Sequence, residues 1–186
     1  MRTAPRVFDM DDGRDWTQTA RGECADCGYD ASRIDVDGFD EALQFEAGAW
    51  AHWLDNADDA AARRRRADGT WSALEYACHV RDLLAVFSER VDLMREGDAD
   101  AMTWWDHEAA AVEQRYNEQD RAEVADAIAN NAMILSAATI GVEGDMWDFT
   151  VERRPGEPFK LVEAVRFALH ESFHHRMDAN DSLNQA

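Results

Sequence analysis

The chain has 186 residues, of which 39 are acidic and 19 basic, and its formal net charge is −20. A field of that sign repels phosphate backbones, so the composition argues against nucleic-acid binding in spite of the basic run at residues 63–66. A hydrophobic fraction of 46% with 3 prolines and 10 glycines indicates one globular domain with a real core, neither disordered nor all-β.

The first 36 residues show no helical or alternating pattern, and they contain the motif Cys24-x-x-Cys27. We expect an extended arm or a compact loop there, followed by a helical domain over residues 37–186. The first helix is predicted over residues 39–57. Its apolar positions recur every three to four residues: Leu43, Ala47, Trp50 and Leu54.

A second helix is predicted to begin after Ser72, where Ser72-x-x-Glu75 can form a capping box, and to end near Gly97. Residues 103–118 are rich in aromatics and indicate a connection, with a helical turn or two after Asp106. The third helix is predicted to follow Asp120 and to end at residue 141.

Residues 141–161 contain an alternating run and a Pro-Gly turn, which favours a short β-hairpin before the last helix. Pro158 suits the first turn of that last helix. Four long amphipathic helices predict an all-α fold, a four-helix bundle.

His170 and His174 are four residues apart in the last helix, one turn apart on one face. Two such imidazoles can hold one metal ion, and His79 at the margin of the second helix's apolar face is a third candidate. His175 points about 100° away from His174, so we expect it not to share that ion. Neutral imidazoles suit zinc, nickel, iron(II) and copper, and we expect zinc or nickel. The alternatives are solvated histidines at 170 and 174 and a hydrogen-bonded histidine at the core edge at 79.

Cys24 and Cys27 lack the second Cys-x-x-Cys pair of many structural zinc sites. We expect a packed or loosely redox-active pair. A site shared between two chains and an arm that folds over the histidines to offer sulfur are the alternatives. Glu75, one turn before His79, and His107, beside two tryptophans, are the candidate catalytic residues, although Glu75 is also explained as a surface carboxylate.

The strings HVRDLL at residues 79–84 and ALHESFHHRMD at residues 168–178 resemble the DinB-like superfamily. WSALEYACHVRDLL, WWDHEAAAVEQRYNEQ and the Cys-x-x-Cys-Gly-Tyr-Asp string are similar to an actinobacterial branch of it. The resemblance covers about residues 24–180. It implies a four-helix bundle in which His79, His170 and His174 bind a divalent metal.

The resemblance also implies chemistry, because the superfamily includes thiol-dependent maleylpyruvate isomerases and bacillithiol transferases. We therefore expect a metal-dependent transferase or isomerase that takes a small thiol, such as mycothiol, and an electrophilic substrate. A metal-dependent hydrolase and a non-catalytic, stress-associated metal-binding protein are the alternatives, and a homodimer is one option for the assembly.

The compartment is predicted from three features. No stretch approaches the ~20 apolar residues of a membrane span, the N-terminus shows no apolar leader region, and three cysteines do not make a disulfide scaffold. We expect a cytoplasmic protein without a membrane partner.

Overall fold

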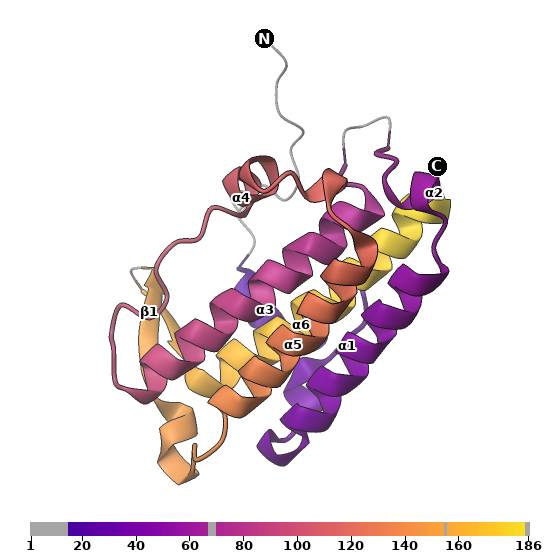
Figure 1. Cartoon of the computed structure of the whole chain (residues 1–186). Helices are drawn as coiled ribbons and strands as arrows, with labels where there is room; N and C mark the ends of the chain where they lie inside the picture. The colour runs from indigo at the N-terminus through magenta and orange to yellow at the C-terminus, as the bar shows by residue number, and fades with distance from the viewer. Residues whose placement is uncertain (1–14, 67–69, 155, 185–186) are drawn as a thin grey trace.

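Four long helices form a bundle in the computed structural model, which describes residues 15–66, 70–154 and 156–184 (Figure 1). The bundle helices are α1 (Phe39–Asn56), α3 (Ala73–Arg95), α5 (Arg121–Ala138) and α6 (Leu161–Asn184). Two short helices, α2 (Asp59–Ala62) and α4 (His107–Glu113), lie in the connections. The predicted four-helix bundle is confirmed.

Helices α1 and α3 each pack against both α5 and α6. Helices α1 and α3 therefore occupy opposite corners of the bundle. Large apolar side chains fill the centre, among them Trp50, Leu84, Ile128 and Leu169. The Trp50 indole donates a hydrogen bond to the backbone oxygen of Ser172 on α6, at 3.1 Å.

The predicted helix starts agree with the observed caps. Ser72 and Glu75 form the capping box of α3, and Asp120 accepts hydrogen bonds from the first backbone N–H groups of α5. After α3 and α5 the chain turns at Gly97 and Gly141, whose φ angles of 84° and 83° favour glycine.

The predicted hairpin consists of β1 (Thr150–Arg154) and β2 (Glu157–Lys160), which pair antiparallel. The prediction that Pro158 lies in the first turn of the last helix is wrong, because Pro158 pairs with Glu152 in the hairpin. A strand with a single partner tolerates proline, whose missing N–H costs no ladder bond on the open side. Helix α6 begins at Leu161, and the Glu163 carboxylate accepts the backbone N–H of Lys160 at 2.8 Å.

Residues 15–38 form a compact segment on α6, built from the short 3-10 helices η1 (Trp16–Ala20), η2 (Ala31–Arg33) and η3 (Val36–Gly38). Arg21 pairs with Glu163 through two contacts of 2.7 and 3.1 Å. Tyr29 stacks on Phe173 with 4.6 Å between the ring centroids. Residues 1–14 of the predicted arm lie outside the described residues. Over the described ranges, no helix has the length and apolar character needed to cross a membrane.

Candidate functional site

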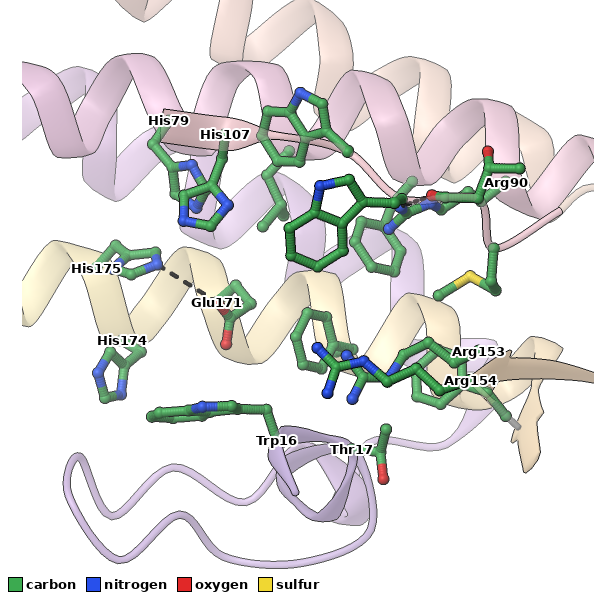
Figure 2. Close-up of a pocket in the computed structure, with 18 of the residues that line it drawn as sticks. Trp16, Thr17, His79, Arg90, His107, Arg153, Arg154, Glu171, His174 and His175 are labelled. Atoms are coloured by element: carbon green, nitrogen blue, oxygen red, sulfur yellow. Dashed lines mark hydrogen bonds and ion pairs between the residues drawn. The ribbon is translucent and has the colours of Figure 1, made fainter. Parts of the chain in front are cut away.

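A cavity of about 220 Å³ lies beside α6, between α3, the 101–107 segment, η1 and the hairpin (Figure 2). Tryptophan and phenylalanine side chains make much of its wall: Trp16, Trp71, Phe87, Trp104, Trp105, Phe159 and Phe167. Figure 2 shows its polar residues in two places, with histidines at one end and arginines at the other.

The histidine end contains three residues that could hold one ion, which we call the His–Glu group: His79, Glu171 and His175. One ligand atom from each lies within 4.8 Å of the others. Helix α3 contributes His79, and α6 contributes Glu171 and His175 at an i, i+4 spacing that places both on one face. Because α3 and α6 pack directly against each other, an ion here would join two helices that are far apart in sequence.

The negative charge of Glu171 is balanced by a positive charge on His175. Burial alone would lower the pKa of His175, but hydrogen bonds to Asp178 and Glu171 outweigh burial and raise that pKa to about 9. Burial alone would raise the pKa of the Glu171 carboxyl, but hydrogen bonds to His170 and His175 hold it well below its usual range. In the absence of an ion, an imidazolium at His175 and a carboxylate at Glu171 therefore form a buried pair, with Nε2 and Oε2 3.4 Å apart.

His79 is a neutral imidazole in an aromatic environment. Burial, followed by the neighbouring His175 and His107, lowers its pKa well below 6.5. Its ring stacks on Trp105 with centroids 5.4 Å apart and an interplanar angle of 5°. Among the described residues, its buried Nδ1 has no hydrogen-bond partner. A neutral histidine with an unsatisfied nitrogen is suited to bind a cation.

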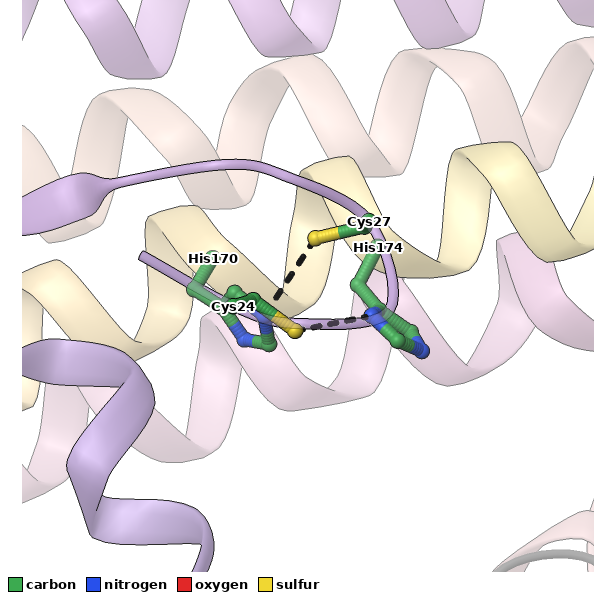
Figure 3. A group of neighbouring side chains, drawn as sticks. All are labelled: Cys24, Cys27, His170 and His174. Carbon is green, nitrogen blue, oxygen red and sulfur yellow. Dashed lines mark hydrogen bonds between the residues drawn. The ribbon is translucent and has the colours of Figure 1, made fainter. Parts of the chain in front are cut away.

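A second set of side chains lies on the neighbouring face of α6, and we call it the Cys–His group: Cys24, Cys27, His170 and His174 (Figure 3). Its four ligand atoms also lie within 4.8 Å of one another. Cys24 Sγ is 3.9 Å from His174 Nδ1, and Cys27 Sγ is 3.6 Å from His170 Nε2.

The structure does not bring the three predicted ligands into one group. His79 lies with Glu171 and His175, whereas His170 and His174 lie with the two cysteines. His174 and His175 do point in different directions, as the helical wheel predicts, and they fall in different groups. Sequence reasoning missed Glu171 and His175. The signal was present in HESFHH, which contains two overlapping i, i+4 pairs, 170 with 174 and 171 with 175.

The two candidate catalytic residues differ in their position. Glu75 does not line the cavity, because its carboxylate accepts the backbone N–H of Ser72 at 2.8 Å and pairs with Arg65. His107 lines the cavity, and its ring centroid is 5.4 Å from that of His79. Burial lowers the pKa of His107.

The other end of the cavity is cationic. Arg90, Arg153 and Arg154 line it, and Glu171 is the one carboxylate among the described lining residues. Arg90 is half-buried, and burial followed by the charge of Arg153 lowers its pKa to about 10. The buried Nε of Arg153 has no hydrogen-bond partner in the part of the chain that is described. Arg153 already pairs with Glu157 at 2.9 Å, but with Arg90 and Arg154 beside it this end of the cavity is still cationic and suits an anion.

Four-helix bundles often build metal sites from histidine and carboxylate side chains on facing helices. This chain has such a bundle, with two groups of side chains able to hold an ion. A family model of the DinB superfamily matches residues 42–178, and the chain belongs to that superfamily. The fold is similar to that of YfiT from Bacillus subtilis, described as a probable metal-dependent hydrolase with an unusual four-helix bundle topology. The two share 14% sequence identity with a TM-score of 0.75, over 91% of this chain and 97% of YfiT. No curated protein matches the sequence.

Proposed function

We propose that the protein is a metal-dependent enzyme that acts on a small anionic substrate in the cavity. Hydrolysis is the first candidate for its reaction. The observation that carries the proposal is the position of the His–Glu group on the wall of a cavity whose far end holds three arginines. A group that can bind a cation and a group that can bind an anion line the same cavity.

The His–Glu group fits a divalent ion by its chemistry, with His175 giving up its extra proton when the ion binds. Two imidazoles and one glutamate form the donor set of hydrolytic zinc sites, which leave a coordination position open. His79 is neutral, and Asp178 Oδ2 lies 3.0 Å from Nδ1 of His175, which orients the His175 ring with Nε2 toward Glu171. Bound there, a zinc ion or a similar cation supplies Lewis-acid character and lowers the pKa of a water or a thiol.

The chain's own residues supply the other functions. Arg90, Arg153 and Arg154 hold an anionic group of the substrate and direct the rest of it toward the histidines. His107 is neutral near pH 7 and lies on the wall beside His79, so it accepts or donates a proton during the reaction. The aromatic wall excludes water and strengthens these charge interactions.

Thiol transfer is the second candidate, and the same arginines support it because they also fit a carboxylate on a thiol or on an electrophile. The glutamate in the His–Glu group favours hydrolysis, because two imidazoles and one glutamate form the donor set of hydrolytic zinc sites. YfiT's description as a probable metal-dependent hydrolase also supports hydrolysis as the first candidate and thiol transfer as the second. The protein would act in the cytoplasm, where thiols stay reduced.

The test uses the full chain, stripped of metal and reloaded with zinc or nickel. Small carboxylate-bearing esters and amides are assayed for hydrolysis. Mycothiol, bacillithiol and glutathione are titrated by calorimetry into the apo and loaded forms. We expect metal-dependent hydrolysis that His79→Ala abolishes.

Thiol binding that requires metal and releases a proton would place thiol transfer first. Metal binding at the His–Glu group with neither hydrolysis nor thiol binding would overturn the enzyme proposal and favour the non-catalytic alternative. The matched control is His52→Ala, which changes an exposed histidine on α1.

A further inference from the structure

The Cys–His group has different donors from the His–Glu group, although its His174 also lines the cavity. Its four donors are two sulfurs and two imidazole nitrogens, and three of its members are buried. Soft sulfur with imidazole selects zinc or a similar soft divalent ion, and four such donors fill a tetrahedral shell. Because four protein ligands leave no position open, a site of this kind is structural.

The distances agree with a tetrahedral ion. With Zn–S of about 2.3 Å and Zn–N of about 2.0–2.1 Å, tetrahedral geometry separates sulfur from nitrogen by about 3.6 Å. The two measured separations are 3.6 Å for Cys27 Sγ to His170 Nε2 and 3.9 Å for Cys24 Sγ to His174 Nδ1. Each of these two sulfur–nitrogen pairs is therefore spaced nearly as a tetrahedral ion requires, and all four donor atoms lie within 4.8 Å of one another.

The loop that carries the cysteines is shaped for ligation. The backbone N–H of Gly28 donates to the oxygen of Cys24 at 2.8 Å, which closes a turn around the motif. Gly28 has φ of 72°, a conformation that favours glycine. Backbone N–H groups of Cys27 and Asp26 also hydrogen-bond the Cys24 sulfur. Such donors stabilise a sulfur that carries negative charge.

The histidines have the outer partners that ligating histidines need. His170 presents Nε2 to Cys27, and its other nitrogen, Nδ1, lies 2.9 Å from Glu171 Oε1. His174 presents Nδ1 to Cys24, and its Nε2 lies 3.6 Å from Asp178 Oδ2. A carboxylate on the second nitrogen fixes the ring and its tautomer for metal binding.

We propose that the Cys–His group is a closed, structural site for one zinc ion, which fastens the segment of residues 15–38 to α6. Two thiolates and two neutral imidazoles cancel the double charge of the ion, so the site can be buried. The segment forms part of the cavity wall through Trp16 and Thr17, so the ion also holds that wall in place. Cys24 and Cys27 lie outside residues 42–178, the part of the chain that matches the superfamily.

In the experiment, the full chain is purified under reducing conditions and then loaded with cobalt(II) or with zinc. Cobalt bound by thiolates absorbs in the near ultraviolet through charge transfer from sulfur, whereas cobalt at the His–Glu group lacks that band. We expect the band in the wild type and two zinc ions per chain. The double variant Cys24→Ala/Cys27→Ala should lose the band and one ion, and His79→Ala should lose the other ion and keep the band.

Two further measurements keep the outcome decisive. Cys78→Ala removes the buried thiol outside the group and should keep the band and both ions. Circular dichroism on the milder variant Cys27→Ser separates loss of the ion from loss of the fold. An unchanged zinc count in the double variant, or no thiolate band in the wild type, would overturn the structural site. The proposal would also be overturned if reduced protein, incubated with zinc, formed a disulfide between Cys24 and Cys27.

Discussion

Glu171 Oε1 lies 2.9 Å from His170 Nδ1, and the other oxygen of the same carboxylate lies 3.4 Å from His175 Nε2. A single side chain thus contacts one histidine of the Cys–His group and one of the His–Glu group. Asp178, about two turns further along α6, also contacts one histidine of each group, His174 and His175. The two groups share their acidic partners, so occupation of one is expected to affect the other.

Glu171→Gln tests that connection. The amide keeps the size of the side chain but removes its charge, so the His–Glu group loses a ligand and His170 loses an anionic partner. We expect metal affinity to fall by 100-fold or more at the His–Glu group and by about 10-fold at the Cys–His group. Competition titration with a chelator measures both, and Asp181→Asn on the exposed side of α6 is the matched control. Unchanged affinity at both groups would contradict the shared role.

Removal of metal should lower thermal stability without loss of helix. An ion in the His–Glu group joins α3 to α6 and binds the folded state, so at 100 times Kd it adds about 2.7 kcal/mol. In a chain of this length that corresponds to about 5–10 °C in Tm. The apolar core remains, so far-ultraviolet circular dichroism at 20 °C should not change on chelation. The same Tm before and after verified removal of metal would mean that the ions bind incidentally.

The arginines of the cavity should govern substrate affinity. Arg90→Gln removes a half-buried guanidinium from the cavity lining, and a hydrogen bond to a charged group contributes about 1.5–3 kcal/mol. We therefore expect KM for an anionic substrate to rise at least 10-fold while the metal content stays the same. Arg33→Gln, outside the cavity and exposed, should leave KM unchanged. An equal KM in Arg90→Gln would remove the basis for an anionic substrate.

Cys78 should be unreactive in the folded protein. Burial raises the pKa of its thiol to about 12, and the thiolate is the reactive form. Between pH 7 and pH 9 the thiol therefore stays protonated, and reaction with iodoacetamide should require unfolding. Mass spectrometry of labelled peptides distinguishes it from Cys24, whose thiol pKa is lowered and which we expect to react after chelation. Rapid labelling of Cys78 at pH 7 would show that α3 opens in that region.

The Ser72 cap of α3 should increase the free energy of unfolding. Ser72→Ala removes the side-chain oxygen that accepts the Glu75 backbone N–H and also bonds Asn117, with 3.2 and 2.6 Å between the heavy atoms. We expect a loss of about 1–2 kcal/mol in the free energy of unfolding, measured in urea. Ser136→Ala, which removes an exposed hydrogen bond to Asp40, should cost less. Equal losses would show that the capping box adds nothing specific.

Local pattern was sufficient to predict the helices and the hairpin. Ser72 and Asp120 begin α3 and α5 because their oxygens satisfy backbone donors within three residues, and such short-range effects can be read from sequence. Apolar spacing likewise places Leu43 and Trp50 in the core. Pro158 was misplaced because its ring suits both a first helical turn and a strand with one free edge, and tertiary pairing with β1 decides between them.

The sequence by itself determined that several histidines of α6 lie near one another, since a helix fixes the relative directions of residues 170 to 175. It did not determine what each direction faces, because neighbouring residues differ by about 100° and the rotation of α6 follows from packing. Only the tertiary structure brings His79 to Glu171 and His175, and Cys24 to His174 across 150 residues. The fold thereby divides the histidines of one segment of α6 between two groups of candidate metal ligands, one with His79 and one with the two cysteines.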